Sequence, residues 1–132
     1  MRSILHVLAF AFATVGCASS GEAEAGPVLG PAKAPEGYTI TTLQELAKDD
    51  SWKGKPVMFE GTINKVGCGD CGGVVLADKT WRLSAEPAEP SKFKIPVKRG
   101  AVVRVWGKLS INGDGFREVK ADRVEFLSEK KS

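Results

Sequence analysis

Hydrophobic and polar residues alternate with a period of two through most of the chain between residues 57 and 126. This period places successive side chains on opposite faces of an extended strand, so one face is buried and the other is exposed. Clusters of glycine, proline and aspartate, which favour turns, separate the alternating stretches. The pattern predicts five β-strands, which cover residues 57–64, 74–77, 80–86, 101–109 and 116–126.

The connections between these strands differ in length and character. Residues 112–115 read Asn-Gly-Asp-Gly, a sequence that suits a tight hairpin turn. Residues 87–99 contain three prolines, yet Phe93, Ile95 and Val97 still alternate within them. We therefore expect residues 87–99 to form an ordered segment and not a loose loop.

Two positions within the strands are irregular. Gly61 falls in the middle of the first strand, where a glycine in a small barrel marks a bend or a close approach of the backbone. In the last strand the alternation slips near residues 122–123, which indicates a β-bulge.

One short helix is expected before the strands. Thr42 and Glu45 have the spacing of an N-terminal capping box, and Leu43 and Leu46 share one helical face, so we expect a helix over residues 42–49. Five strands with a long connection between the third and the fourth are typical of the OB-fold, a small Greek-key barrel. An SH3-like barrel and a small sandwich are the alternatives. The sequence therefore predicts an all-β fold for residues 38–128, a five-stranded OB-like Greek-key barrel with a short N-terminal helix.

The first sixteen residues have the features of an export signal. Arg2 supplies a positive charge, and a twelve-residue, mostly apolar stretch follows from Ile4 to Val15. A membrane span needs about 20 apolar residues, so this stretch is too short to cross a bilayer. The ending Thr14 to Cys17 resembles a bacterial lipobox, which implies cleavage before Cys17 and lipidation of its sulfur. An ordinary signal peptide followed by a chance cysteine is the alternative.

A linker is expected between this cysteine and the barrel. Residues 17–37 are dominated by alanine, glycine, serine and proline, so they bury too little apolar surface to offset the entropy of ordering. We expect them to be flexible, and residues 129–132 to be a short tail. The arrangement predicts a lipoprotein of the bacterial cell envelope that is anchored in the outer membrane and faces the periplasm.

Charge and composition exclude several classes of function. The 132 residues include 19 Lys or Arg and 16 Asp or Glu, a near balance that does not favour a nucleic-acid binder. The only histidine, His6, lies in the export signal, so the mature domain lacks the imidazole of Ser-His-Asp and Cys-His enzymes and of histidine metal sites. We therefore expect a binding or accessory protein rather than an enzyme.

Cys68 and Cys71 form a Cys-Gly-Asp-Cys sequence in the turn between the first two strands. Two thiols at this spacing can form a disulfide, exchange electrons with another thiol pair, or hold a soft metal ion. Copper in its cuprous form accepts few thiolate ligands, whereas zinc would need Asp70, Asp78 or a second chain to complete its shell. A disulfide would staple the turn and contribute about 2 kcal/mol.

A second candidate site lies on the barrel surface. If the alternation holds, Lys79, Arg82, Arg104 and Trp106 point away from the core. An exposed aromatic ring among basic residues can stack bases or sugars. In the alternative interpretation, Trp106 packs beneath the N-terminal helix or the proline-rich segment, and the charges only face water.

The sequence also resembles a known family over most of residues 54–110. Features shared with it include two cysteines after the first strand and a proline-containing stretch before a strand that ends in Gly-Lys. The residues that carry the similarity are 54–57, 60–63, 66–68, 71–76, 93–96 and 102–109. This segment is similar to a family of uncharacterised exported bacterial OB-like domains. The resemblance implies an exported OB-like fold and implies no particular activity.

Together these observations predict a membrane-anchored envelope lipoprotein that carries an OB-like binding or accessory module. Its partners are expected to be an envelope protein, a peptide or a saccharide, and nucleic acid is not expected. No cofactor is expected unless Cys68 and Cys71 hold copper or zinc. The competing hypothesis is a thiol-dependent redox or soft-metal-binding protein that uses these two cysteines.

Overall fold

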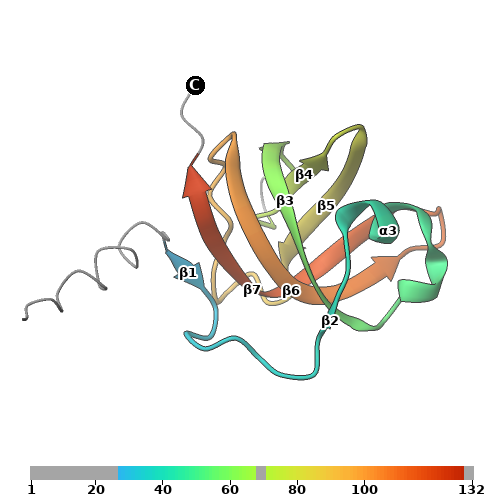
Figure 1. The fold of residues 1–132 in the computed structure, drawn as a ribbon, viewed down its shortest axis with the longest axis horizontal. Helices are drawn as coiled ribbons and strands as arrows, with labels where there is room; N and C mark the ends of the chain where they lie inside the picture. Colours follow the sequence, from blue (N-terminus) through green and yellow to red (C-terminus); the bar gives the residue numbers. More distant parts are fainter. Residues whose placement is uncertain (1–26, 68–70, 130–132) are drawn as a thin grey trace, which may run out of the picture.

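The computed structural model of the chain describes residues 27–67 and 71–129 (Figure 1). Within them one short α-helix and a single turn of 3-10 helix accompany seven strands, of which two are very short. The helices are α3 (Leu43–Lys48) and η2 (Asp50–Trp52), and the strands are β1 (Val28–Leu29), β2 (Thr39–Ile40), β3 (Pro56–Val66), β4 (Val74–Asp78), β5 (Trp81–Pro87), β6 (Ala101–Ile111) and β7 (Arg117–Glu129).

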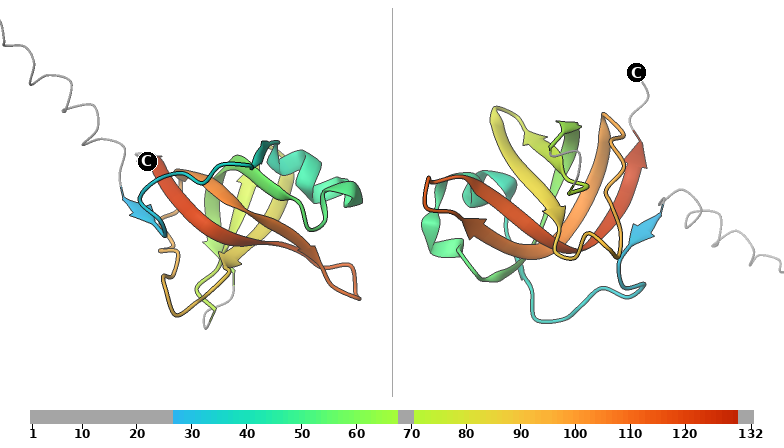
Figure 2. Two further views of the ribbon diagram at one scale, coloured as in Figure 1. Left: turned by 90° about the horizontal axis from the view of Figure 1, so that it is seen from below. Right: turned by 180° about the vertical axis from the view of Figure 1, so that it is seen from behind.

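The five long strands close into a barrel. β4 pairs with β3 and β5, and β6 pairs with β3 and β7, all in antiparallel fashion. The parallel pairing of β5 with β7 closes the ring in the order β3-β4-β5-β7-β6. Figure 2 shows the same ring of curved strands from two further sides. This connectivity is that of the OB-fold, so the prediction of an all-β, five-stranded Greek-key barrel with a short helix is confirmed.

The barrel interior is filled by one face of each strand. Val57, Phe59 and Ile63 of β3 are at most 1% exposed, and alternate residues of β6 are buried in the same way. Gly61 belongs to the same inward row of β3, and a Cβ atom there would lie 3.0 Å from Cδ1 of Leu43. The atom nearest to this position therefore belongs to a side chain of α3 and not to another backbone segment.

Helix α3 packs across β3, β4 and β5. Thr42 caps it by accepting a hydrogen bond on its Oγ1 from the Glu45 backbone N–H at 3.1 Å, as the capping pattern predicted. Leu43 and Leu46 are fully buried. The Arg117 guanidinium of β7 donates from Nε to the Leu46 carbonyl at 2.9 Å, so the last turn is also fixed.

A bulge lies in β7 where the sequence predicted one. Trp106 is paired with Arg123, whereas the next residue, Gly107, is paired with Ala121, so Asp122 is the extra residue. The extra residue explains the slip in the hydrophobic pattern, because Ala121 and Val124 both face the core.

The long connection between β5 and β6 is ordered, as expected. Ile95 is only 4% exposed, and its N–H donates to the Gly72 carbonyl at 3.0 Å. Val97 differs from the expected inward alternation, because 43% of its surface is exposed. The Lys98 N–H donates to the Pro96 carbonyl at 3.0 Å, so the chain turns at Val97. It rejoins the barrel at Gly100, which has a φ of +86° and donates to the Ile63 carbonyl at 2.9 Å.

Residues 27–32, which begin the described part of the expected flexible linker, are instead held on the barrel. β1 pairs with β7, and the Arg123 guanidinium donates to the carbonyls of Pro31 and Ala32 at 2.9 and 3.1 Å. We refer to residues 27–40 as the N-terminal arm. The prediction of a flexible linker was based on composition, which indicates how much apolar side-chain surface a segment can bury. The arm is instead held through its backbone carbonyls.

Tyr38 also fixes the arm, since its hydroxyl donates to Oδ2 of Asp122 in the β7 bulge at 2.7 Å. Partial burial, the hydrogen bond to Asp122 and the negative charge of Asp122 raise the pKa of Tyr38 to about 12. The folded protein holds this proton more tightly than the unfolded chain, whose tyrosine pKa is about 10. The stabilising contribution is therefore complete below pH ~10 and is lost as the pH rises to about 12.

Tyr38 is the chain's single tyrosine, so tyrosinate absorbance reports this contact alone. We expect a titration midpoint near pH 12 for the folded protein and near pH ~10 for the denatured chain. The Asp122→Asn variant should have a midpoint between these two, because it loses the charge of Asp122 but keeps the partial burial of Tyr38. A midpoint near 10 in the folded wild type, under conditions where tryptophan fluorescence shows that the barrel is intact, would contradict the contact.

Candidate functional site

A groove of about 560 Å³ lies on the outer face of the barrel, where β4, β5 and β7 meet the end of β3. Most of its wall is apolar or uncharged, and the charged groups lie along its sides. It is lined by Lys65, Val66, Gly67, Gly73, Val74, Val75, Ser84, Ala85, Glu86, Phe116 and Glu118. We call it the Phe116 groove. It lies on the second and third strands of the barrel, which is the face that OB-folds use for ligands.

Phe116 is held in place by its backbone while its ring faces solvent. It ends the turn between β6 and β7, where the Asn112 side-chain oxygen accepts hydrogen bonds from the N–H groups of Asp114 and Phe116, both at 2.9 Å. The Asn112 N–H donates in turn to the Phe116 carbonyl at 3.0 Å. Half of the Phe116 surface, 51%, is nevertheless exposed. A fixed, exposed aromatic ring at the edge of a groove can stack against a flat or apolar part of a ligand.

The charges beside the groove largely compensate one another. Lys120 forms an ion pair with Glu118 at 2.9 Å and another with Glu86. The hydrogen bonds to Glu86 and Glu118 raise the pKa of Lys120, so it stays protonated between them. Arg82, which lies along the same face, turns its guanidinium to the carbonyls of Lys79 and Trp81. The groove therefore has neither the dense positive charge of a phosphate-binding surface nor a strong negative charge.

A second groove, of about 540 Å³, lies where β2 and the start of α3 meet β3 and the β4–β5 turn. We call it the Ile40 groove, because Ile40 is 73% exposed at its edge. Its wall combines apolar and polar side chains and backbone. It is lined by Ile40, Thr41, Thr42, Met58, Phe59, Glu60, Gly61, Thr62, Ala77, Asp78, Lys79 and Val102.

The four surface residues singled out in the sequence do not form one site. Arg82 lies with Phe116, whereas Lys79, in a left-handed conformation with a φ of 57°, lines the Ile40 groove. Arg104 lies beside that groove, because its guanidinium binds Oε2 of Glu60 at 2.7 and 3.1 Å. It also reaches Glu125 of β7 at 3.9 Å. Arg104 is therefore an ion-pair partner within the barrel wall.

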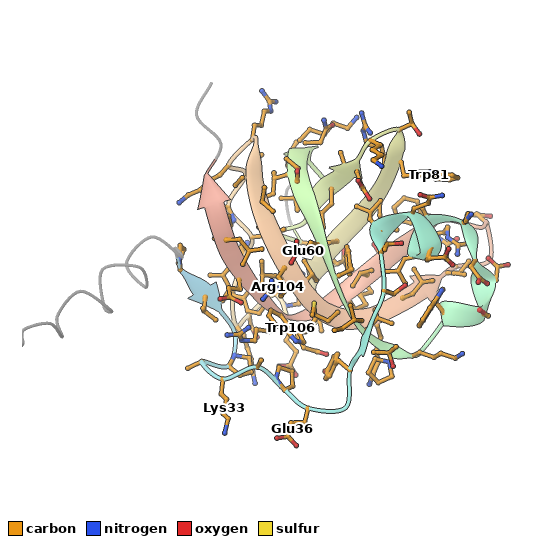
Figure 3. The ribbon with its side chains drawn as sticks, viewed as in Figure 1. Lys33, Glu36, Glu60, Trp81, Arg104 and Trp106 are labelled. Carbon is orange, nitrogen blue, oxygen red and sulfur yellow. The ribbon has the colours of Figure 1, made fainter. Side chains whose placement is uncertain are left out.

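Trp106 points away from the barrel core but is only 5% exposed. The Arg123 guanidinium lies over its ring, 4.3 Å from the centroid, and the same guanidinium holds the N-terminal arm. In Figure 3 Trp106 lies beside Arg104 and Glu60, on the side where the arm with Lys33 and Glu36 passes. The ring thus offers no free face for stacking in this conformation. Of the two interpretations, the one in which Trp106 is packed is closer to the structure. The group that covers the ring is the Arg123 guanidinium and not the N-terminal helix or the proline-rich segment.

Sequence reasoning placed Phe116 only as the first residue of the last strand and missed its exposure. One signal was available. An aromatic residue directly after an Asn-Gly-Asp-Gly turn stands at the end of a barrel hairpin, where the loop between the fourth and fifth OB strands contributes to ligand binding.

Of the cysteines, Cys71 lies in the described residues, where it is half-buried and disulfide-bonded. The next residue, Gly72, has a φ of +73°, and a Cβ atom there would lie 2.7 Å from Cγ of Lys94. The turn is therefore fitted closely against the β5–β6 connection. Cys68 and the lipidation candidate Cys17 lie outside the described residues, so the pairing of Cys68 with Cys71 stays a prediction.

Over residues 27–67 and 71–129, no three side chains of His, Cys, Asp or Glu gather closely enough to hold a metal ion. In the same part of the chain, no helix has the length and apolar character of a membrane span.

Comparison with known proteins bears on the fold. No protein-family model matches the sequence, and no curated protein matches it. Among solved structures, an aspartyl-tRNA synthetase candidate from Leishmania major Friedlin is similar over 92% of this chain, with a TM-score of 0.59 and 16% identity. The hypothetical protein ygiW from E. coli is similar over 77% of this chain and 99% of its own, with a TM-score of 0.52 and 16% identity.

The asparaginyl-tRNA synthetase from Pyrococcus horikoshii is similar over 69% of the chain, with a TM-score of 0.52 and 18% identity. The likeness is one of fold. This chain spans only about a quarter of each synthetase, 27% and 23% of their lengths, so their activities do not transfer. The comparisons agree with the strand connectivity in assigning an OB-fold.

Proposed function

We propose that this protein is an envelope lipoprotein, anchored through lipid on Cys17, whose OB barrel binds a ligand in the Phe116 groove. The exposed Phe116 ring, fixed by the Asn112 turn at the edge of an apolar groove, is the observation that carries the proposal. Large apolar rings exposed on rigid backbone are typical of binding hot spots. The export signal and the lipobox-like ending of residues 14–17 support the location.

The chemistry of the groove favours a peptide or a saccharide over a nucleic acid. Val66 and Val75 provide apolar surface, while Ser84 and Glu86 offer hydrogen-bonding groups. A single-stranded nucleic acid would need uncompensated lysines and arginines along its backbone, whereas Lys120 is engaged by two carboxylates. Soluble peptidoglycan fragments contain both saccharide and peptide and are therefore a suitable first probe.

We expect NMR titration of the mature chain with such fragments to shift amides of residues 65–67, 74–75, 84–86 and 116–118, which line the groove. The Phe116→Ala variant removes the stacking ring and should raise the dissociation constant at least about tenfold. Its folding stability should change little, because half of the ring is already in solvent.

Ile40→Ala is the matched control, since it removes an exposed apolar side chain from the other groove. This variant should bind as the wild type does. The proposal fails if the shifts cluster around Ile40, if Phe116→Ala binds normally, or if an oligothymidine binds at least as tightly as the fragments.

We further propose that Cys68 and Cys71 form a disulfide that staples the β3–β4 turn. The disulfide-bonded state of Cys71 and the tight fit of Gly72 against Lys94 support this structural role. The two cysteines enclose a very short loop, and closing such a loop restricts the unfolded chain only modestly. The competing redox or copper-binding and zinc-binding hypotheses predict a pair that is readily reduced or that carries metal.

Replacing both Cys68 and Cys71 with serine should lower the free energy of unfolding by about 2 kcal/mol in denaturant titration. Reduction of the wild type should produce the same loss, and ligand binding in the Phe116 groove should persist. Copper or zinc in a one-to-one ratio after anaerobic purification, lost on Cys68→Ser, would favour the metal hypothesis instead.

A further inference from the structure

A group of basic residues lies at the end of the barrel where β6 begins. Lys94, Lys98 and Arg99 of the β5–β6 connection are exposed, and Val97 between them is 43% exposed. We call these four side chains the basic end. The connection, residues 88–100, contains one acidic residue, Glu89, which is paired with Lys92 at 3.0 Å. Lys98 lies over the ring of Phe126, with its Nζ 5.5 Å from the centroid.

The basic end lies on the side of the molecule where the N-terminal arm begins. β1 pairs with Val124 and Glu125 of β7, and β7 runs on from there to pair Glu129 with Ala101, the first residue of β6. In all three views β1, the end of β7 and the segment that leads into β6 lie on the same side (Figures 1 and 2). The chain therefore approaches the barrel next to its basic end.

The packed arm also limits how far the barrel can stand from the lipid anchor proposed above. Pro27 is fixed, because its carbonyl accepts a hydrogen bond from the Phe126 N–H at 3.0 Å. Nine residues separate Pro27 from Cys17, and even a fully extended chain of this length spans at most about 35 Å. A free linker up to residue 37 would have allowed about twice that reach.

We propose that the basic end docks on the anionic phospholipid headgroups of the bilayer that holds the lipid anchor. The inference rests on the proposed anchoring at Cys17, which keeps the barrel close to the bilayer. Exposed lysine and arginine side chains near an anionic surface add electrostatic attraction to a lipid anchor. Val97 projects among the cations and can enter the headgroup layer. The Phe116 groove, whose flanking charges are compensated, stays available for its ligand.

The test separates the basic end from the anchor by using the mature chain with Cys17→Ser, which cannot be acylated. We expect this protein to sediment with vesicles of phosphatidylcholine mixed with phosphatidylglycerol and not with phosphatidylcholine alone. Adding Lys94→Glu and Arg99→Glu should lower the partition coefficient at least about tenfold. Each lysine or arginine near an anionic surface raises this coefficient several-fold. Arg99→Glu alone, which leaves the Lys94 contact with Gly72 intact, should have about half the logarithmic effect.

Lys48→Glu with Lys108→Glu is the matched control, because it changes the net charge equally at exposed positions on α3 and β6. This control should keep at least half of the wild-type partitioning. Equal binding to both kinds of vesicle, or an equal loss in the control, would overturn the proposal. Tighter binding to an oligothymidine than to the anionic vesicles would assign the basic end to nucleic acid instead.

Mass measurement of the native mature N-terminus tests the anchor independently. An unmodified Cys17 together with normal vesicle binding would remove the proposed anchor and leave the basic end as a membrane-binding surface. An acylated Cys17 together with no vesicle binding would leave the anchor and remove this inference.

Discussion

The parallel pairing of β5 with β7 is the constraint on which the rest of the structure depends. Residues 84–87 of β5 pair with residues 118–121 of β7, and only this ladder turns an open antiparallel sheet into a barrel. Closure satisfies the backbone groups of both edges and encloses the apolar row of every strand. It also sets β7 beside β5, so that Phe116, Ser84 and Glu86 border the same groove.

Closure also separates the outer surface into regions of different chemistry. Around Phe116 the carboxylates of Glu86 and Glu118 are paired with Lys120, so an apolar surface remains between compensated charges. At the basic end, Lys94 and Arg99 lie on a connection whose one acidic residue, Glu89, is already paired with Lys92. The ligand site proposed in the Phe116 groove and the headgroup contact proposed for the basic end therefore involve different residues of the barrel.

Much of the fold could be predicted from the sequence because the relevant interactions are local. Alternation located the five strands, the Thr42 capping pattern located α3, and the slip near residue 122 located the bulge. The position of the N-terminal arm could not be found in this way. It depends on Arg123, which is 92 residues from Pro31 in sequence and holds the arm by its carbonyl groups.

The Arg123 guanidinium also explains why Trp106 is not the exposed stacking ring that the sequence predicted. Alternation gives the direction of the Trp106 side chain correctly but says nothing about the Arg123 side chain that covers it. Phe116 was missed for the opposite reason, since it begins a strand by pattern but stays half exposed beside the turn. The local pattern predicts the direction of a side chain. Contacts with residues that are distant in the sequence decide whether that side chain is accessible to solvent.

Amide hydrogen exchange in the β5–β7 ladder tests the account of a closed barrel most directly. We predict that amides of residues 84–86 and 118–121 that bond across this ladder exchange as slowly as those of the β6–β7 pairing, since both open only with the whole barrel. Rapid exchange in this ladder alone, beside slow exchange in β6, would show that the barrel opens between β5 and β7. The Phe116 groove would then not be a fixed feature of the molecule.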